Sequence, residues 1–297
     1  MASGELFDDE FLRRLQRLGL IAKRMPAPSA ASGQRRSQRL GDGLEFADHR
    51  QYSPGDDIRF LDWNYYARME RLLLRLFHMH SEGAVTILLD ASASMALGNP
   101  PKFDYARRAA AALAYVAMIS LDRVNILPFG QALQAGLATG RNAGKILQVL
   151  EYLRPLQAQG PTALGAVLDQ LLRRHPQSGT VLLLSDLLEV EDELSAGLAL
   201  LRRRRDEVIV LHVIDPGEAQ PPAAGAVQLE AAESRRRMEI NLTPELVDNY
   251  RQRFQRFAHG VEKTCLARGA IYLPAHTEME FDRLVLLTLQ KAGLLQQ

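Results

Sequence analysis

Short runs dominated by Val, Ile and Leu, separated by segments with helical spacing, limit this chain to few folds. The clearest runs cover residues 85–89, 123–127, 180–184 and 207–214. Strands that are apolar on both faces must be covered on both faces, which is typical of parallel sheets flanked by helices. The pattern therefore predicts an α/β fold with a doubly wound, mostly parallel sheet.

Segments with helical spacing lie between and after these runs. They cover residues 102–121, 141–153, 163–173, 194–204, 244–268 and 281–294. Apolar runs at 131–137 and 270–273 are further candidate strands, and 227–229 with 238–240 predict a small β excursion. Because the alternation begins only after residue 80, we divide the chain into an N-terminal extension, 1–80, and a sheet domain, 81–297.

The N-terminal extension is predicted to be helical and irregular. Residues 5–23 place Phe11, Leu15 and Leu18 at near-helical spacing, with Asp8 or Asp9 as the helix N-cap. Residues 25–37 are rich in Pro, Ala, Ser and Gly, which predicts a loop. Residues 41–68 show no clear period, and residues 71–78 predict a strand.

Charge and hydropathy exclude several classes of protein. Lys plus Arg number 36 and Asp plus Glu number 35, and this net charge of +1 gives no global attraction to nucleic acid or to an acidic membrane. No apolar stretch reaches the roughly 20 residues of a membrane-spanning helix, and the N-terminus does not resemble a secretory signal. The single cysteine, Cys265, fits a reducing compartment. We therefore expect a soluble, cytoplasmic protein.

Polar side chains follow two of the predicted core strands at their carboxyl ends. Asp90, Ser92 and Ser94 follow the strand at 85–89, Asp186 follows the strand at 180–184, and Thr162 lies in a turn between them. In open α/β sheets, ligands bind beyond the carboxyl ends of the strands, where the winding reverses. Hard cations prefer oxygen ligands, so these five residues predict a site for Mg²⁺ or another divalent cation, such as Mn²⁺ or Ca²⁺.

Two carboxylates and three hydroxyls leave such a cation with an open coordination position. A carboxylate of another protein can fill that position, which predicts metal-dependent protein binding and no catalysis. Plainer roles stay open, with Ser92, Ser94 and Asp186 as capping residues, or a scaffold with a vestigial, metal-free site. An Asp-nucleophile phosphatase is a further alternative, although Ser92 stands where such an enzyme carries its acid-base Asp.

The loop and the two later residues resemble the metal-ion-dependent adhesion site of von Willebrand factor A domains. That site combines an Asp-x-Ser-x-Ser loop, a distant Thr, and an Asp after the next core strand, and all three parts occur here in that order. The resemblance implies a von Willebrand factor A-like sheet and a divalent cation that takes part in protein binding.

A longer signature precedes the sheet domain. It reads Gly-Leu-Glu-Phe at 43–46, Arg-Gln-Tyr at 50–52, Gly-Asp-Asp-Ile-Arg-Phe-Leu-Asp-Trp at 55–63 and Ala-Arg at 67–68. This pattern resembles domain of unknown function 58, a bacterial and archaeal family that joins it to a von Willebrand factor A-like domain. The resemblance implies work with a MoxR-type AAA+ ATPase, in chaperone-like remodelling or metal-centre maturation of target proteins. Many relatives carry transmembrane helices, and this chain resembles the short, soluble form.

Charged and aromatic residues of the signature are candidate partner-binding residues, with a structural brace as the alternative. They are Arg50, Asp56, Asp57, Arg59, Asp62, Trp63 and Arg68.

Overall fold

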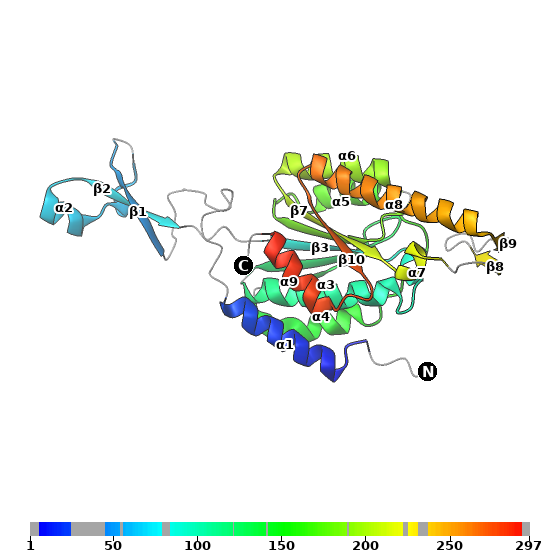
Figure 1. Cartoon of the computed structure of the whole chain (residues 1–297). Coiled ribbons are helices and arrows are strands. Elements are labelled where there is room, and N and C mark those ends of the chain that lie inside the picture. Colours follow the sequence, from blue (N-terminus) through cyan, green and yellow to red (C-terminus); the bar gives the residue numbers. More distant parts are fainter. Residues whose placement is uncertain are drawn as a thin grey trace. The chain divides into compact units, whose positions relative to one another are not determined.

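The computed structural model describes residues 6–24, 45–53, 56–78, 84–120, 122–140, 142–188, 190–221, 225–230 and 237–292. The chain forms two compact units, one made of Met1–Met25 with Ala84–Gln297 and the other of Pro26–Gly83. Figure 1 shows the elements of both. This division differs from the expected 1–80 and 81–297, because the first helix belongs with the sheet.

The larger unit is built on a six-stranded sheet. Its strands are β3 (Ala84–Asp90), β4 (Arg123–Phe129), β5 (Leu137–Thr139), β6 (Thr180–Ser185), β7 (Glu207–Ile214) and β10 (Ile271–His276). The spatial order is β10-β7-β6-β3-β4-β5, and every pair is parallel except β4 with β5. From β3 the chain builds outward through β4 and β5, then returns to add β6 on the other side. This confirms the predicted doubly wound, mostly parallel sheet, with the switch of direction between β3 and β6.

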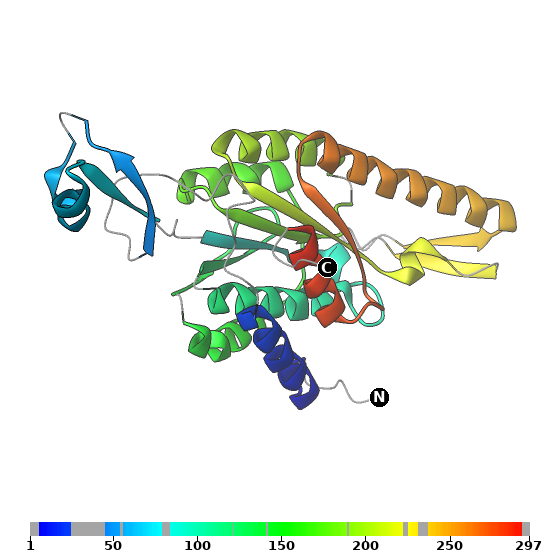
Figure 2. The ribbon, with the colours of Figure 1, turned by 60° about the vertical axis from the view of Figure 1, so that its left-hand side comes forward.

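Helices cover both faces of this sheet (Figure 1). One face carries α3 (Lys102–Ile119), α4 (Ile146–Leu153) and α9 (Phe281–Lys291), and the other carries α5 (Leu164–Arg174), α6 (Glu191–Arg204) and α8 (Pro244–Ala267). Figure 2 shows the same layers from a second side. Helix α3 is buried on nearly all sides, which explains its run of alanines, since small side chains let the sheet and three helices approach it.

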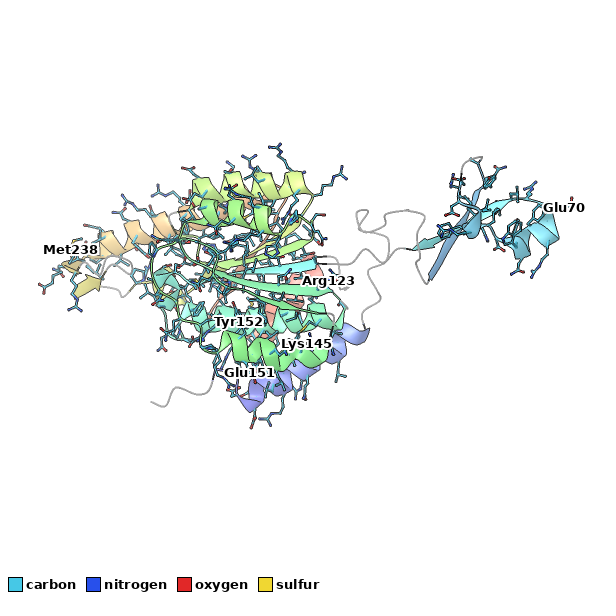
Figure 3. All side chains as sticks on the ribbon, turned by 180° about the vertical axis from the view of Figure 1, so that it is seen from behind. Glu70, Arg123, Lys145, Glu151, Tyr152 and Met238 are labelled. Atoms are coloured by element: carbon cyan, nitrogen blue, oxygen red, sulfur yellow. The ribbon has the colours of Figure 1, made fainter. Side chains whose placement is uncertain are left out.

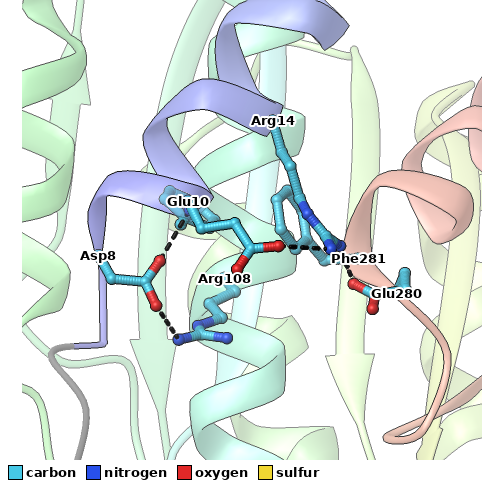
Figure 4. Close-up of a pocket in the computed structure, with 7 residues that line it drawn as sticks. Asp8, Glu10, Arg14, Arg108, Glu280 and Phe281 are labelled. Carbon is cyan, nitrogen blue, oxygen red and sulfur yellow. Dashed lines mark hydrogen bonds and ion pairs between the residues drawn. The ribbon is translucent and has the colours of Figure 1, made fainter.

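Helix α1 (Asp9–Arg24) packs on α3 and α9, which explains the difference in unit boundaries. Its apolar stripe is buried, and the Phe11 ring lies 4.7 Å from the Phe281 ring, centroid to centroid. Asp8 caps the helix by accepting from the Phe11 N–H at 2.7 Å. Figure 4 shows the shallow pocket at this junction, where Arg14 is already paired with Glu10 and Glu280. We therefore regard the pocket as part of the helix-docking interface.

The apolar run at 131–137 is not the strand that the sequence predicts, because β5 begins only at Leu137. The loop before β5 is held by hydrogen bonds to side chains and not by backbone pairing with a neighbouring strand. The Leu133 N–H donates to the Gln170 side chain at 3.2 Å, and the Tyr152 hydroxyl donates to the Ala135 carbonyl at 2.5 Å. Figure 3 labels Tyr152 on α4.

Beyond the sheet, the chain adds further short elements. They are the 3-10 turns η2 (Ala93–Ala96) and η3 (Ala143–Lys145), helix α7 (Pro216–Ala219), and the antiparallel pair β8 (Gly225–Glu230) and β9 (Arg237–Leu242). The antiparallel pair confirms the predicted β excursion.

The smaller unit contains the antiparallel strands β1 (Glu45–Gln51) and β2 (Leu73–His78), the 3-10 turn η1 (Ile58–Phe60) and helix α2 (Trp63–Met69). Strand β2 was predicted, whereas β1 and α2 were not, because neither has a clear apolar period. The Asp62 carboxylate caps α2 by accepting from the Tyr65 N–H at 2.9 Å. Gly43, Leu44 and Gly55 of the signature lie outside the described residues.

Candidate functional site

The predicted site residues gather at the switch point of the sheet. Strands β3 and β6 are parallel neighbours in register Leu89 to Leu184, so Asp90 and Ser185 end the two strands side by side. Asp186 follows directly, and both Asp90 and Asp186 are buried. This is the edge where open α/β sheets bind their ligands, because helix N-termini and strand ends leave polar groups there.

Asp90 is held by hydrogen bonds to both of its carboxylate oxygens. The Ser185 hydroxyl donates to Oδ2 at 2.6 Å and the Ser92 N–H donates to Oδ1 at 2.9 Å. Burial and the neighbouring Asp186 raise the pKa of Asp90 to about 6, although these hydrogen bonds act in the opposite direction. Two neighbouring buried carboxylates repel one another when both are charged, and a cation close to them would relieve that repulsion.

The hydroxyls of Ser92 and Ser94 face one another at 3.1 Å between their Oγ atoms. Ser92 begins η2 without a side-chain bond to the backbone, so the capping role considered for it is not seen. Asp186 does not cap α6 either, since that helix begins at Glu191 after Val190. Its Oδ1 accepts from the Leu188 N–H at 3.3 Å.

Thr162 comes from the loop that lies against the Asp90 loop. The Ala93 N–H donates to the Gly160 carbonyl at 2.7 Å, and the Gln159 N–H donates to the Ala91 carbonyl at 2.8 Å. The Oγ1 atom of Thr162 is buried and, among the described residues, has no hydrogen-bond partner. A buried hydroxyl without a partner costs about 1–3 kcal/mol, so an occupant that satisfies it is favoured.

The sequence did not predict one further member of the site, Lys102. Its side chain is fully buried, and its Nζ donates to Asp186 Oδ2 at 2.7 Å and to Glu218 Oε1 at 2.5 Å. Burial lowers the pKa of Lys102, but Asp186 and Glu218 outweigh it, and the net pKa is raised. The ammonium therefore stays charged. A sequence signal existed, because a lysine in the first turn of a helix is opposed by the helix dipole.

The donor set fits a hard divalent cation. It combines carboxylate oxygens, two hydroxyls in contact and a third hydroxyl without a partner, which is the oxygen chemistry that Mg²⁺ prefers. The described residues hold no group of three or more His, Cys, Asp or Glu side chains arranged for a metal. A site at this edge would therefore depend on its hydroxyls.

The candidate partner-binding residues all lie in the smaller unit. Arg50 of β1 donates to Asp56 at 2.7 Å, and Arg59 donates to Asp57 at 2.7 Å, while Asp57 also caps η1. Trp63 is 57% exposed and lies edge-on to Tyr66, with 6.3 Å between ring centroids. Arg68 is exposed in the last turn of α2. The charged pairs brace the loop between β1 and α2, whereas the aromatic pair faces outward.

Residues 48–263 match the model of a family described as Protein of unknown function DUF58. The chain belongs to the DUF58 family. Relatives include the Uncharacterized protein Rv1480 of Mycobacterium tuberculosis and the Uncharacterized protein Mb1516 of Mycobacterium bovis. Each is 27% identical over 286 residues, which cover 95% of this chain and 89% of the relative. The family match covers the N-terminal signature from residue 48 onward and most of the sheet domain of this DUF58 protein.

Solved structures similar to this DUF58 protein include a conserved hypothetical protein BatB from Bacteroides thetaiotaomicron, with a TM-score of 0.45 and 17% identity, covering 71% of this chain and 97% of that chain. An aerotolerance-related membrane protein from Bacteroides fragilis gives a TM-score of 0.44 and 16% identity, covering 72% of this chain and 100% of that chain. The SpRpn10 VWA domain gives a TM-score of 0.40 and 13% identity, covering 69% of this chain and 94% of that chain. In the part of the chain that the structure describes, no helix combines the length and the apolar character needed to cross a membrane.

Proposed function

We propose that this DUF58 protein is an adaptor that binds a protein partner through a divalent cation, with Mg²⁺ as the first candidate. Asp90, Ser92, Ser94, Thr162 and Asp186 would hold the cation, directly or through water. The observation that carries the proposal is the buried Thr162 hydroxyl without a partner, beside the Asp90 loop. When bound, the cation would supply a positive charge with a free coordination position.

The partner group is proposed to be a carboxylate. Asp90, Ser92, Ser94, Thr162 and Asp186 offer five side chains, whereas Mg²⁺ takes six oxygen ligands in an octahedron. One coordination position is therefore open to water or to a group from outside. A carboxylate from a partner would supply a hard oxygen ligand at that position. The same chemistry gives no reason for a bond to be made or broken, and we propose no catalytic role.

The proposed co-worker is a MoxR-type AAA+ ATPase in the cytoplasm. The basis is the family, whose members are associated with such ATPases. An adaptor of this kind would present a target protein for remodelling or maturation. The exposed pair Trp63 and Tyr66 is proposed as a second contact surface, because aromatic side chains with polar tips are favoured at protein interfaces.

Replacing Thr162 with Val is expected to weaken binding of the MoxR-type ATPase of the same organism by about 10- to 100-fold in Mg²⁺. Valine keeps the shape of threonine and removes only the hydroxyl offered to the cation. The measurement is biolayer interferometry with both proteins purified, in Mg²⁺ and in chelator. The matched control is Thr139→Val, because the Thr139 hydroxyl donates to Val124 at the sheet edge. Binding that resists chelator and both substitutions would contradict the metal-dependent mechanism.

A further inference from the structure

Lys102 lies in a place that is costly for a lysine. Its side chain is 0% exposed, and it begins α3, where the helix dipole opposes a positive charge. Burial of an ammonium is tolerated only where carboxylates compensate it, and here Asp186 and Glu218 both do so. The arrangement is therefore a three-member ion cluster at the switch point of the sheet.

The second carboxylate of this cluster comes from a different element. Glu218 lies on α7, whose first turn is fixed by Asp215, since the Gly217 N–H donates to Asp215 Oδ2 at 2.9 Å. The Glu218 side chain is 22% exposed, whereas that of Asp186 is 5% exposed. Lys102 thus connects a buried candidate ligand to a partly exposed acidic residue at the rim.

Counting charges shows what the cluster does to the site. Asp90, Asp186 and Glu218 contribute three negative charges and Lys102 contributes one positive charge, which leaves a net charge of −3 + 1 = −2. His212 adds no charge at neutral pH, because burial lowers its pKa to about 4. Without Lys102 the same place would carry a charge of −3 and attract a divalent cation more strongly.

We infer that Lys102 is the residue that sets the affinity of this site for a divalent cation, keeping it weak until a partner carboxylate joins. The inference rests on the proposed metal-dependent function and deepens it. The Lys102 ammonium neutralises Asp186 and repels a second cation at close range. Glu218 has the opposite effect, because it draws part of the ammonium charge away from Asp186. Lys102 therefore lowers the affinity of the site for a divalent cation, and Glu218 raises it.

This opposition can be tested on the full chain with Mn²⁺ as the probe. Electron paramagnetic resonance measures free Mn²⁺ directly, and so gives a dissociation constant without any partner protein. Lys102→Gln keeps hydrogen-bond donors for Asp186 and removes the charge, and we expect about tenfold tighter Mn²⁺ binding or more. Glu218→Gln leaves the ammonium less compensated, and we expect about tenfold weaker binding. Lys145→Gln, at an exposed lysine labelled in Figure 3, should match wild type.

The outcomes separate this inference from the proposed function. If wild type binds Mn²⁺ and both substitutions weaken binding or leave it unchanged, Lys102 is only structural and the inference is overturned, while the metal site stands. If no form of the protein binds Mn²⁺, including Lys102→Gln, the metal-dependent function itself fails. Should Lys102→Gln not fold, as judged by circular dichroism and melting, Glu218→Gln decides alone, and equal or tighter binding overturns the inference.

Discussion

Replacing Asp90 with Asn is expected to abolish divalent-cation binding and to make the metal-free protein more stable at neutral pH. The pKa of Asp90 is raised from 3.8 to about 6 in the folded protein, so folding disfavours its charged form. The stability that this group contributes is complete below pH 3.8 and is lost as the pH rises through 6. A difference of about two pKa units corresponds to about 3 kcal/mol at pH 7, which Asn would recover.

Urea denaturation in chelator checks this prediction at pH 4 and at pH 7.5. The stability gained by Asp90→Asn should be large at pH 7.5 and should nearly vanish at pH 4, where wild type also carries a neutral side chain. Added Mg²⁺ should raise the stability of wild type and leave the variant unchanged. The control is Glu239→Gln, at an exposed position on β9, which should follow wild type. A variant less stable than wild type at pH 7.5 in chelator would show that burial does not penalise the Asp90 charge.

Replacing Gly179 with Ala is expected to destabilise the protein by about 3 kcal/mol. A Cβ atom at this position would lie 2.2 Å from the backbone carbonyl oxygen of Ala84, at the start of β3. A flexible side chain could move away, but this oxygen is fixed within the sheet next to the paired strands β3 and β6. The clash can therefore be relieved only if β3 and β6 move apart at their N-terminal ends.

Urea denaturation at pH 7.5 measures this effect, with Gly140→Ala as the matched control. A Cβ atom on Gly140 would meet nothing nearer than the Lys145 Nζ, at 3.8 Å. That substitution should change the free energy of unfolding by less than about 0.5 kcal/mol. If Gly179→Ala were as stable as Gly140→Ala, the tight approach of the chain between residues 84 and 179 would be wrong.

The sheet could be predicted because its strands carry local signals. Strands β3, β6 and β7 are nearly continuous Val, Ile and Leu, and their spacing along the chain requires crossover helices. The position of Asp90 and Asp186 at strand ends follows from the same reasoning, whereas the order of the strands in the sheet comes from the structure. Strand β1 and helix α2 could not be predicted, because they are short and polar and depend on contacts such as the Asp62 cap.

The candidate site was only partly predictable for a physical reason. The five oxygen-bearing residues follow strands or turns, so their placement depends on topology that the sequence pattern already contains. Lys102 reaches Asp186 across 84 positions of sequence and Glu218 across 116, and these pairings arise only when α3 and α7 pack at the sheet edge. The hydrogen bond from the Ser185 hydroxyl to Asp90 likewise joins residues that are 95 positions apart in the sequence. Such long-range ion pairs and hydrogen bonds leave no periodic signal in the sequence.

The most direct test of the metal-dependent account is a crystal of the protein soaked in Mn²⁺ and measured for anomalous scattering. The account predicts a single strong peak beside the hydroxyls of Ser92, Ser94 and Thr162, with Asp90 and Asp186 within one water molecule of it. The Thr162 hydroxyl should then be a ligand, which would satisfy the buried oxygen that has no partner among the described residues. No peak even when millimolar Mn²⁺ is supplied together with acetate as the outside carboxylate, or a peak only at other carboxylates, would contradict the account.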